Sequence, residues 1–146
     1  MNITILTHET IEESQLTPDA IASFLFTALE QYGDKKEDIM KCLGYALSAE
    51  PGKGGLIAVS QDADQITGAV VINHTGMGGY IPENILVYIA VDTSQRGKGV
   101  GRHLMQAVIE GTSGDIALHV EPDNPAKRLY ERLGFTNKYL EMRLHK

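Results

Sequence analysis

The stretch of sequence that decides the fold is VDTSQRGKGVGR, residues 91–102, which joins an apolar segment to an amphipathic one. A glycine-rich turn between a strand and a helix leaves several backbone N–H groups unpaired, and the helix dipole adds partial positive charge there. Glycines allow an anion to approach the backbone closely, and Arg96, Lys98 and Arg102 add full positive charges. The stretch therefore predicts a binding site for phosphate groups.

Two well-known phosphate loops do not match this stretch. A Walker A loop requires G-x-x-x-x-G-K-[ST], and that pattern occurs nowhere in the chain. A dinucleotide fingerprint requires G-x-G-x-x-G, but Arg102 stands where the last glycine should be. Both mismatches disfavour an ordinary nucleotide-binding module. A turn without any ligand is the alternative, and turn geometry alone explains the clustered glycines and cations poorly.

Upstream of this stretch, the apolar pattern predicts strands and helices in alternation. Thr17 followed by Pro18 is typical of a helix start, and Asp34 with Glu37 three residues later resembles a capping box for a second helix. The predicted elements are a strand at 2–7, two helices within 17–50, a hairpin of strands at 56–60 and 66–73, a glycine-rich loop at 75–82, and a strand at 85–92 that is buried on both faces.

Downstream, a helix is expected at 99–111 and a strand at 116–120. Asn124 should cap a last helix that ends at Gly134, and a terminal strand is expected at 138–145. The order βααβββαβαβ predicts an α/β (α+β) domain with a mixed sheet. We expect residues 1–146 to form a single domain.

The amino-acid composition limits the classes of protein to which the chain can belong. The chain has 146 residues, of which 42% are hydrophobic and 22% charged, so it can bury a core. It contains no apolar run long enough for a membrane span, and its acidic amino terminus does not resemble a secretory signal. Cys42 is the single cysteine, so we expect a reducing, cytoplasmic location. No cluster of residues has metal-ligand spacing.

Charge is distributed unevenly along the chain. The net charge is −6, but residues 1–95 hold 4 basic and 13 acidic side chains, giving −9, whereas residues 96–146 hold 9 and 6, giving +3. A general nucleic-acid binder would normally be basic, so that class is disfavoured. The basic last third favours a polyanionic ligand, although chance distribution over solvated faces explains it equally well.

Two motifs together resemble the Gcn5-related N-acetyltransferase (GNAT) family. Arg96-x-x-Gly99-x-Gly101 is similar to its R/Q-x-x-G-x-G/A signature, and residues 124–135, NPAKRLYERLGF, are similar to N-x-x-A-x-x-L-Y-x-x-x-G-F with one residue fewer after the Asn. The resemblance covers 85–136 closely. It implies a mixed, mostly antiparallel central sheet of about six to seven strands with about four flanking helices, and a splayed strand pair that holds the cofactor.

The resemblance implies a site for acetyl-CoA. The glycine-rich turn would grip the pyrophosphate, mostly through backbone N–H groups, and the preceding strand would pair with the pantetheine arm. The residues implied in cofactor binding are Ile89, Ala90, Val91, Arg96, Gly97, Lys98, Gly99, Val100, Gly101, Arg102, Asn124, Lys127 and Tyr130. Arg128 lies beside Lys127, and a solvated helix face explains both as well as a phosphate contact does.

The resemblance also implies catalytic roles. Tyr130 matches the tyrosine near the cofactor sulfur, where a phenol can protonate a leaving thiolate; the alternative is a core aromatic. Glu83, just before the buried strand, is the candidate base that takes the proton of the amine, and a water relay is the alternative. Tyr80, Tyr88 and His119, together with Glu83, are expected to contact the acceptor.

The leading hypothesis is therefore an N-acetyltransferase that moves an acetyl group from acetyl-CoA to a primary amine by direct attack in a ternary complex. The alternative is a catalytically silent domain that binds an acyl-CoA as a sensor or scaffold. The −9 charge of residues 1–95 favours a cationic small molecule or basic peptide terminus as acceptor. Neither nucleic acid nor membrane is expected as a partner, and family resemblance leaves a homodimer open.

Overall fold

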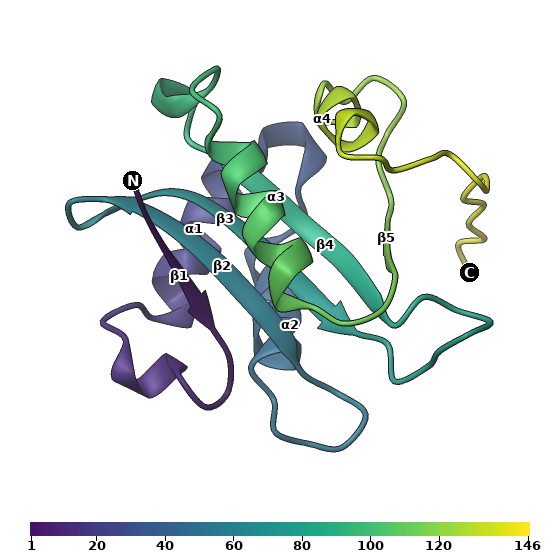
Figure 1. Cartoon of the computed structure of the whole chain (residues 1–146), viewed down its shortest axis with the longest axis horizontal. Coiled ribbons are helices and arrows are strands. Elements are labelled where there is room, and N and C mark those ends of the chain that lie inside the picture. The colour runs from purple at the N-terminus through teal and green to yellow at the C-terminus, as the bar shows by residue number, and fades with distance from the viewer.

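A computed structural model describes the whole chain, residues 1–146, as a five-stranded sheet with helices on both faces (Figure 1). None of its helices is both long and apolar enough to cross a membrane. The strands are β1 Asn2–Leu6, β2 Gly55–Asp62, β3 Gln65–His74, β4 Asn84–Val91 and β5 Ile116–Leu118. The helices are α1 Pro18–Leu29, α2 Lys36–Ala46, α3 Val100–Gly111 and α4 Ala126–Arg132, with short 3-10 turns at Ile11–Glu13, Glu30–Tyr32 and Thr93–Gln95.

The sheet has the order β1-β2-β3-β4-β5. Its first four strands pair antiparallel, and β5 pairs parallel to β4. The predicted mixed, mostly antiparallel fold is thus confirmed. The sheet has five strands, fewer than predicted, because the segment 138–145 forms no strand: no residue after Phe135 makes a backbone hydrogen bond.

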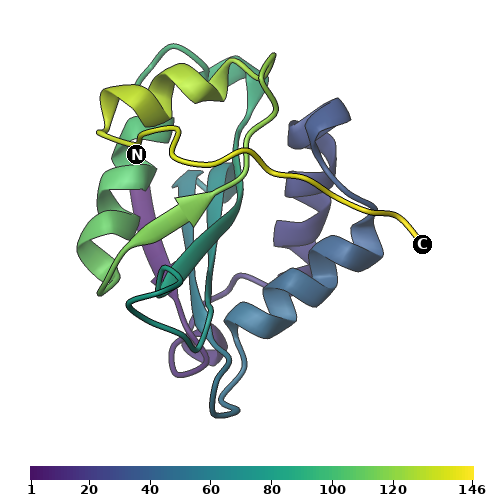
Figure 2. The same cartoon turned by 90° about the vertical axis from the view of Figure 1, so that its right-hand side faces the viewer.

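The helices form two layers around the sheet, as Figure 2 shows edge-on. One hydrophobic cluster lies between the sheet and α1 and α2; its largest members include Leu25, Ile39 and Leu43. A second cluster lies on the other face under α3 and α4, around Leu104, Met105 and Tyr130. The alternating burial of the central strands divides their side chains between these two cores.

Most of the predicted helix ends are confirmed. The Thr17 hydroxyl accepts the N–H of Ala20 at 3.2 Å, Asn124 Oδ1 accepts that of Ala126 at 3.0 Å, and Gly134 follows α4 at φ +100°. The predicted capping box at Asp34 is wrong. Residue 35 precedes α2 without any side-chain cap, because the Asp34 carboxylate accepts a hydrogen bond from Tyr88 of β4 instead.

Candidate functional site

The gap between β4 and β5 opens at a defined residue. The two strands pair only through Asn84–Ile116, Ile85–Ala117 and Leu86–Leu118. On its other side β4 contains a bulge, since Val71 of β3 pairs with Tyr88 and Ile72 pairs with Leu86, which leaves Val87 without a partner. A bulge bends a strand and increases its twist. The end of the β4–β5 pairing and the bulge coincide, so β4 diverges from β5 from Val87 onward. Val87 was predicted to be buried, but it is 36% exposed.

The edge of β4 that faces this gap carries free backbone groups. The N–H of Asp92 donates to the Thr67 carbonyl on β3 at 2.8 Å. Because successive residues of an antiparallel strand point their N–H and C=O groups to opposite edges, those of Val91 and Ile89 face the gap. Ala90, by the same alternation, faces β3. Two of the three residues predicted to pair with the pantetheine arm therefore face the gap. The Val91 carbonyl accepts a hydrogen bond from Arg96 Nε, so the groups of Ile89 and the N–H of Val91 remain available.

The glycine-rich turn between β4 and α3 has the expected unpaired donors. Gly97 and Gly99 adopt φ values of +80° and +81°, a region that side chains other than glycine rarely occupy. None of the backbone N–H groups of residues 97–102 donates to a protein acceptor; the first bond of this helix runs from His103 to the Gly99 carbonyl. Consecutive N–H groups at the N-terminus of a helix favour an anion, and α3 is 12 residues long.

The three cations of the turn differ in what they contact. Lys98 and Arg102 are exposed and make no ion pair or hydrogen bond, so they remain free for an anion. Arg96, in contrast, is engaged: Nε donates to the Val91 carbonyl at 3.3 Å and Nη2 to the Ala28 carbonyl at 3.2 Å. Nη2 also lies 3.8 Å from Glu30 Oε1. Arg96 thus links the glycine-rich turn to the end of α1 by hydrogen bonds.

The segment that connects α1 to α2 contacts three separate parts of the site. Its first residue, Glu30, pairs with Arg96 of the turn. The Tyr32 hydroxyl donates to the Asp123 carbonyl before α4 at 3.3 Å, and Asp34 Oδ2 accepts the Tyr88 hydroxyl of β4 at 2.6 Å. Burial, and then the bond to Asp34, raise the pKa of Tyr88. Sequence reasoning missed Asp34 as a site residue, because its spacing to Glu37 suggested a helix cap.

Tyr130 lies on the opposite face of the sheet from Tyr88, in the cluster under α3 and α4. It is 6% exposed, and its ring centre lies 5.9 Å from that of Phe135. Burial raises its pKa to about 12. Its hydroxyl makes no hydrogen bond with the protein, yet it is not among the fully buried atoms that lack a partner. The phenol is therefore held by packing and keeps a free, accessible donor.

Glu83 lies at the paired end of β4, away from the point where the strands diverge. Its Oε1 accepts the N–H of Asp115 at 2.9 Å, and this bond lowers the pKa of the carboxyl group. A lower pKa makes a carboxylate a weaker base. Two predicted acceptor contacts, Tyr80 and His119, are exposed and make no side-chain hydrogen bond. Their predicted roles, like that of Glu83 as base, stay predictions.

The second motif lies where α4 packs on α3. A Cβ added to Gly101 would meet Leu129 Cδ2 at 3.3 Å and Val91 Cγ2 at 3.6 Å, so glycine permits this close approach. Asn124 uses Oδ1 as the helix cap and leaves its Nδ2 without a partner. Lys127 and Arg128 make no ion pair. The start of α4 therefore presents one amide donor and two free cations.

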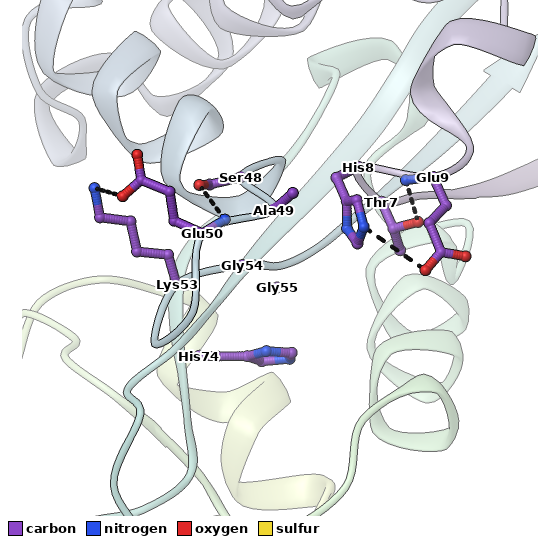
Figure 3. A pocket seen from close by; sticks show the side chains of 10 residues that line it. All are labelled: Thr7, His8, Glu9, Ser48, Ala49, Glu50, Lys53, Gly54, Gly55 and His74. Atoms are coloured by element: carbon purple, nitrogen blue, oxygen red, sulfur yellow. Dashed lines mark hydrogen bonds and ion pairs between the residues drawn. The ribbon is translucent and has the colours of Figure 1, made fainter.

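A pocket of about 350 Å³ lies at the other end of the sheet (Figure 3). His74, which lines it, pairs with Asn84 at the start of β4, whereas the glycine-rich turn follows the end of β4. His8 and His74 point into this pocket, beside the ion pair of Glu50 and Lys53. The lining residues are Thr7, His8, Glu9, Ser48, Ala49, Glu50, Lys53, Gly54, Gly55 and His74. The pocket is thus separate from the site at the glycine-rich turn.

Comparison with known protein families shows to which family the chain belongs. The sequence matches the model of the acetyltransferase (GNAT) domain over residues 53–137, more than half of the chain. The chain therefore belongs to the GNAT acetyltransferase family. A comparison with curated proteins gave no match.

Solved structures share the whole fold at low sequence identity. A ribosomal-protein-alanine N-acetyltransferase from Brucella melitensis biovar Abortus 2308 is 14% identical, with a TM-score of 0.65 over 100% of both chains. A possible acetyltransferase from Clostridium difficile 630 is 20% identical, with a TM-score of 0.66 over 99% of this chain and 96% of that one. An aminoglycoside acetyltransferase from an uncultured soil metagenomic sample, solved with sisomicin, is 16% identical, with a TM-score of 0.64 over 99% and 94%. At sequence identities of 14% to 20%, these similarities show a shared fold and nothing further.

Proposed function

We propose that this chain is an N-acetyltransferase that uses acetyl-CoA and acetylates a primary amine by direct attack in a ternary complex. The observation that carries the proposal is the alignment of two features on β4. The strand diverges from β5 at Val87, and a row of unpaired N–H groups at residues 97–102 follows its end. An elongated acyl carrier with a pyrophosphate matches both features. Together with the family, they support acyl transfer by one domain that spans residues 1–146.

The residues present fit acetyl-CoA. The N–H groups of residues 97–102, with Lys98 and Arg102, would hold the pyrophosphate. The backbone groups of Ile89 and the N–H of Val91 would pair with the pantetheine amides, together with Asn124 Nδ2. Lys127 and Arg128 would meet a further phosphate. When bound there, acetyl-CoA supplies an acetyl group activated as a thioester.

Tyr130 is the proposed proton donor. Its phenol is protonated throughout the neutral range, and burial raises its pKa further, to about 12. Its hydroxyl is free of protein partners, so the proton is available to a departing sulfur within hydrogen-bond reach. We propose that water removes the proton of the amine, since Glu83 is engaged with Asp115 at the paired end of β4.

The acceptor is proposed to be cationic. The Asp34 carboxylate contacts Tyr88 of β4, and Glu37 and Asp38 lie in the first turn of α2, where Asp38 pairs with Lys41. Acidic side chains around a site raise the local concentration of cations. The fold neighbour that was solved with the aminoglycoside sisomicin is in keeping with such an acceptor. A cytoplasmic location is proposed from the single, buried Cys42.

A catalytically silent domain that binds an acyl-CoA is the second candidate. The engagement of Glu83 favours it, because the candidate base accepts a hydrogen bond from Asp115 at the paired end of β4.

Two measurements test the proposals together. Acetyl-CoA should raise the melting temperature, because a ligand that binds only the native state stabilises it. A panel of amines should then release free CoA thiol, with polyamines and aminoglycosides above neutral or acidic amino acids. A thermal shift without turnover of any amine supports the silent domain. The absence of a thermal shift contradicts both candidates.

A further inference from the structure

The pocket of Figure 3 is formed by three segments that lie far apart in the sequence. Residues 7–9 follow β1, residues 48–55 run from the end of α2 into β2, and His74 ends β3. The pocket lies at the end of the sheet opposite to the glycine-rich turn. None of the residues proposed to hold acetyl-CoA or the acceptor lines it, so the proposed function gives this pocket no role.

Hydrogen bonds hold the walls of this pocket in place in the absence of a ligand. The Tyr45 hydroxyl of α2 contacts the Gly52 carbonyl at 3.1 Å and the His74 carbonyl at 2.7 Å, so it joins the loop after α2 to the end of β3. The His74 N–H donates to the Gly54 carbonyl at 2.8 Å. A binding site that is formed in advance requires less ordering when a ligand binds.

Glycine at position 54 keeps the pocket open. Gly54 has φ +103°, and a Cβ added to it would lie 3.3 Å from the Ser48 carbonyl oxygen and 3.8 Å from His74 Nδ1. Both neighbours line the pocket, so a side chain at residue 54 would extend into it. The pocket has a volume of about 350 Å³. Since one water molecule occupies about 30 Å³ in the liquid, this volume accommodates a solute of roughly ten non-hydrogen atoms.

The lining of the pocket is polar and carries both signs of charge. One of its ten residues is hydrophobic, which disfavours an apolar ligand. Lys53 Nζ lies 3.0 Å from Glu50 Oε2 on one wall, and His8 Nε2 lies 3.7 Å from Glu9 Oε1 on the other. The His74 imidazole lies between these two pairs in Figure 3 and makes no hydrogen bond with either. A ligand in the pocket would therefore meet cationic and anionic groups together.

These groups match a small zwitterion. With uncharged imidazoles, the one lysine and two glutamates give the lining a net charge of −1, which disfavours a simple anion. No three His, Cys, Asp or Glu side chains are grouped so that they could hold a metal ion. We propose that the pocket binds a free α-amino acid with a polar side chain. Its ammonium group lies against Glu9 and Glu50, and its carboxylate lies against Lys53 and His74.

Each group of such a ligand finds a partner in the pocket. Lys53 donates to the carboxylate, and so does His74, because a neutral imidazole always carries one N–H donor. Hydrogen bonds of this kind, in which one partner is charged, are the stronger ones. Ser48 Oγ accepts the Glu50 N–H at 3.1 Å and keeps its own proton for the polar side chain of the ligand. The ligand thus joins the loop after β1 to the loop after α2.

Thermal shift and calorimetric titration without acetyl-CoA test the proposal. The probes are serine, asparagine and glutamine, each compared with its N-acetyl derivative, which lacks the ammonium group, and with its amide, which lacks the carboxylate. A free amino acid at ten times its Kd should raise Tm by about 4 °C, and both derivatives should bind about tenfold more weakly or worse. Equal binding of either derivative would show a site for simple anions or cations and overturn the proposal. The absence of binding by all three amino acids would overturn it as well.

Two variants test whether the amino acid binds in this pocket. Lys53→Gln and His74→Ala should each weaken its binding about tenfold, with an unchanged circular dichroism spectrum because both side chains are exposed. Lys41→Gln is the matched control. Lys41, like Lys53, pairs with a carboxylate three residues before it, but it does not line the pocket. Unchanged binding in both pocket variants would overturn the proposal.

The inference does not depend on the proposed function, because the titrations contain no acetyl-CoA. Asp34→Asn, at the proposed acceptor site, should bind the amino acid with the affinity of the natural chain. Loss of binding in Asp34→Asn, with retention in Lys53→Gln, would place the amino acid at the acceptor site and contradict the proposal. A chain that binds the amino acid but not acetyl-CoA would overturn the proposed function alone.

Discussion

The Tyr88 hydroxyl donates to Asp34 Oδ2 at 2.6 Å, which joins residue 88 of the central sheet to the connector between α1 and α2. Arg96 of the glycine-rich turn contacts the Ala28 carbonyl at the end of α1 and Glu30 at the start of the connector, and Tyr32 of the connector donates to the Asp123 carbonyl. Residues 28–34 thus link the strand, the turn and the loop before α4. We regard this connector as the part that fixes the relative positions of the walls of the site.

Replacing Tyr88 by Phe should test the strength of this link. The variant keeps the buried ring and removes one hydrogen bond to a carboxylate, so the free energy of unfolding should fall by about 1.5–3 kcal/mol in urea denaturation. Tyr80→Phe is the matched control, because Tyr80 is 79% exposed and makes no hydrogen bond. Equal stabilities of the two variants would contradict a contribution of the Asp34 bond.

Stability should decrease at alkaline pH. Burial raises the pKa of Cys42 from 9.0 to about 11 and that of Tyr130 from 10.0 to about 12. The folded state therefore retains these protons at pH values where the unfolded chain has lost them. Their contribution to stability is complete below pH 9 and is lost as the pH rises through about 11 and 12.

Urea midpoints at about pH 8 and pH 11 measure this loss. Cys42→Ala removes one of the three groups whose pKa is raised, the others being Tyr88 and Tyr130. Its midpoint should therefore fall less between the two pH values than that of the natural chain. A fall of the same size in both proteins would show that Cys42 does not titrate as the structure indicates.

Glycine is required at the turn for its backbone conformation. Gly97 has φ +80° and open space around it, so Gly97→Ala should cost about 1–2 kcal/mol from the left-handed conformation alone. Gly44→Ala is the matched control: it lies inside α2 with nothing within 4 Å of an added Cβ, and it should stabilise the protein by about 0.5–1 kcal/mol. The same sign for both substitutions, measured by chemical denaturation, would exclude the conformational explanation.

The cations of the turn should separate into two classes. Lys98→Ala and Arg102→Ala should each weaken acetyl-CoA binding about tenfold, or about 1.4 kcal/mol, without loss of stability, because neither contacts the protein. Arg96→Ala should lower the melting temperature of the free protein, since it removes the contacts to Ala28 and Val91. Calorimetric titration measures the affinities, and Lys53→Ala at the opposite end of the sheet should leave binding unchanged. Tight binding by Lys98→Ala/Arg102→Ala would place the pyrophosphate elsewhere.

Tyr130 and Glu83 should differ in their effect on the rate. Tyr130→Phe should lower kcat by a factor of about 100 or more with KM nearly constant, as expected for loss of a positioned acid. Glu83→Gln retains an oxygen acceptor for the N–H of Asp115 and should keep kcat within about threefold and the pH profile unchanged. Loss of the acidic limb of that profile in Glu83→Gln would identify Glu83 as the base after all.

The sequence predicted the local structure of the candidate site wherever neighbouring residues alone decide it. Gly97 and Gly99 permit one turn, Asn124 and Gly134 bound one helix, and the motif pair indicates the family. Local patterns misled where a distant group competed. Asp34 has the spacing of a helix cap, but a hydroxyl 54 residues away takes its carboxylate, and no local pattern records that contact.

By itself, the sequence determined the glycine-rich turn, the two apolar faces and the family, because these depend on glycine conformations, alternation and residue types that lie close together in the chain. Only the tertiary structure decided the bulge at Val87, the engagement of Arg96 and Glu83, and the free outer edge of β5. Each of these depends on which groups meet across the sheet. Such a contact is fixed by the packing of the whole chain, in which a buried hydrogen bond is made by whichever partner the fold brings within reach.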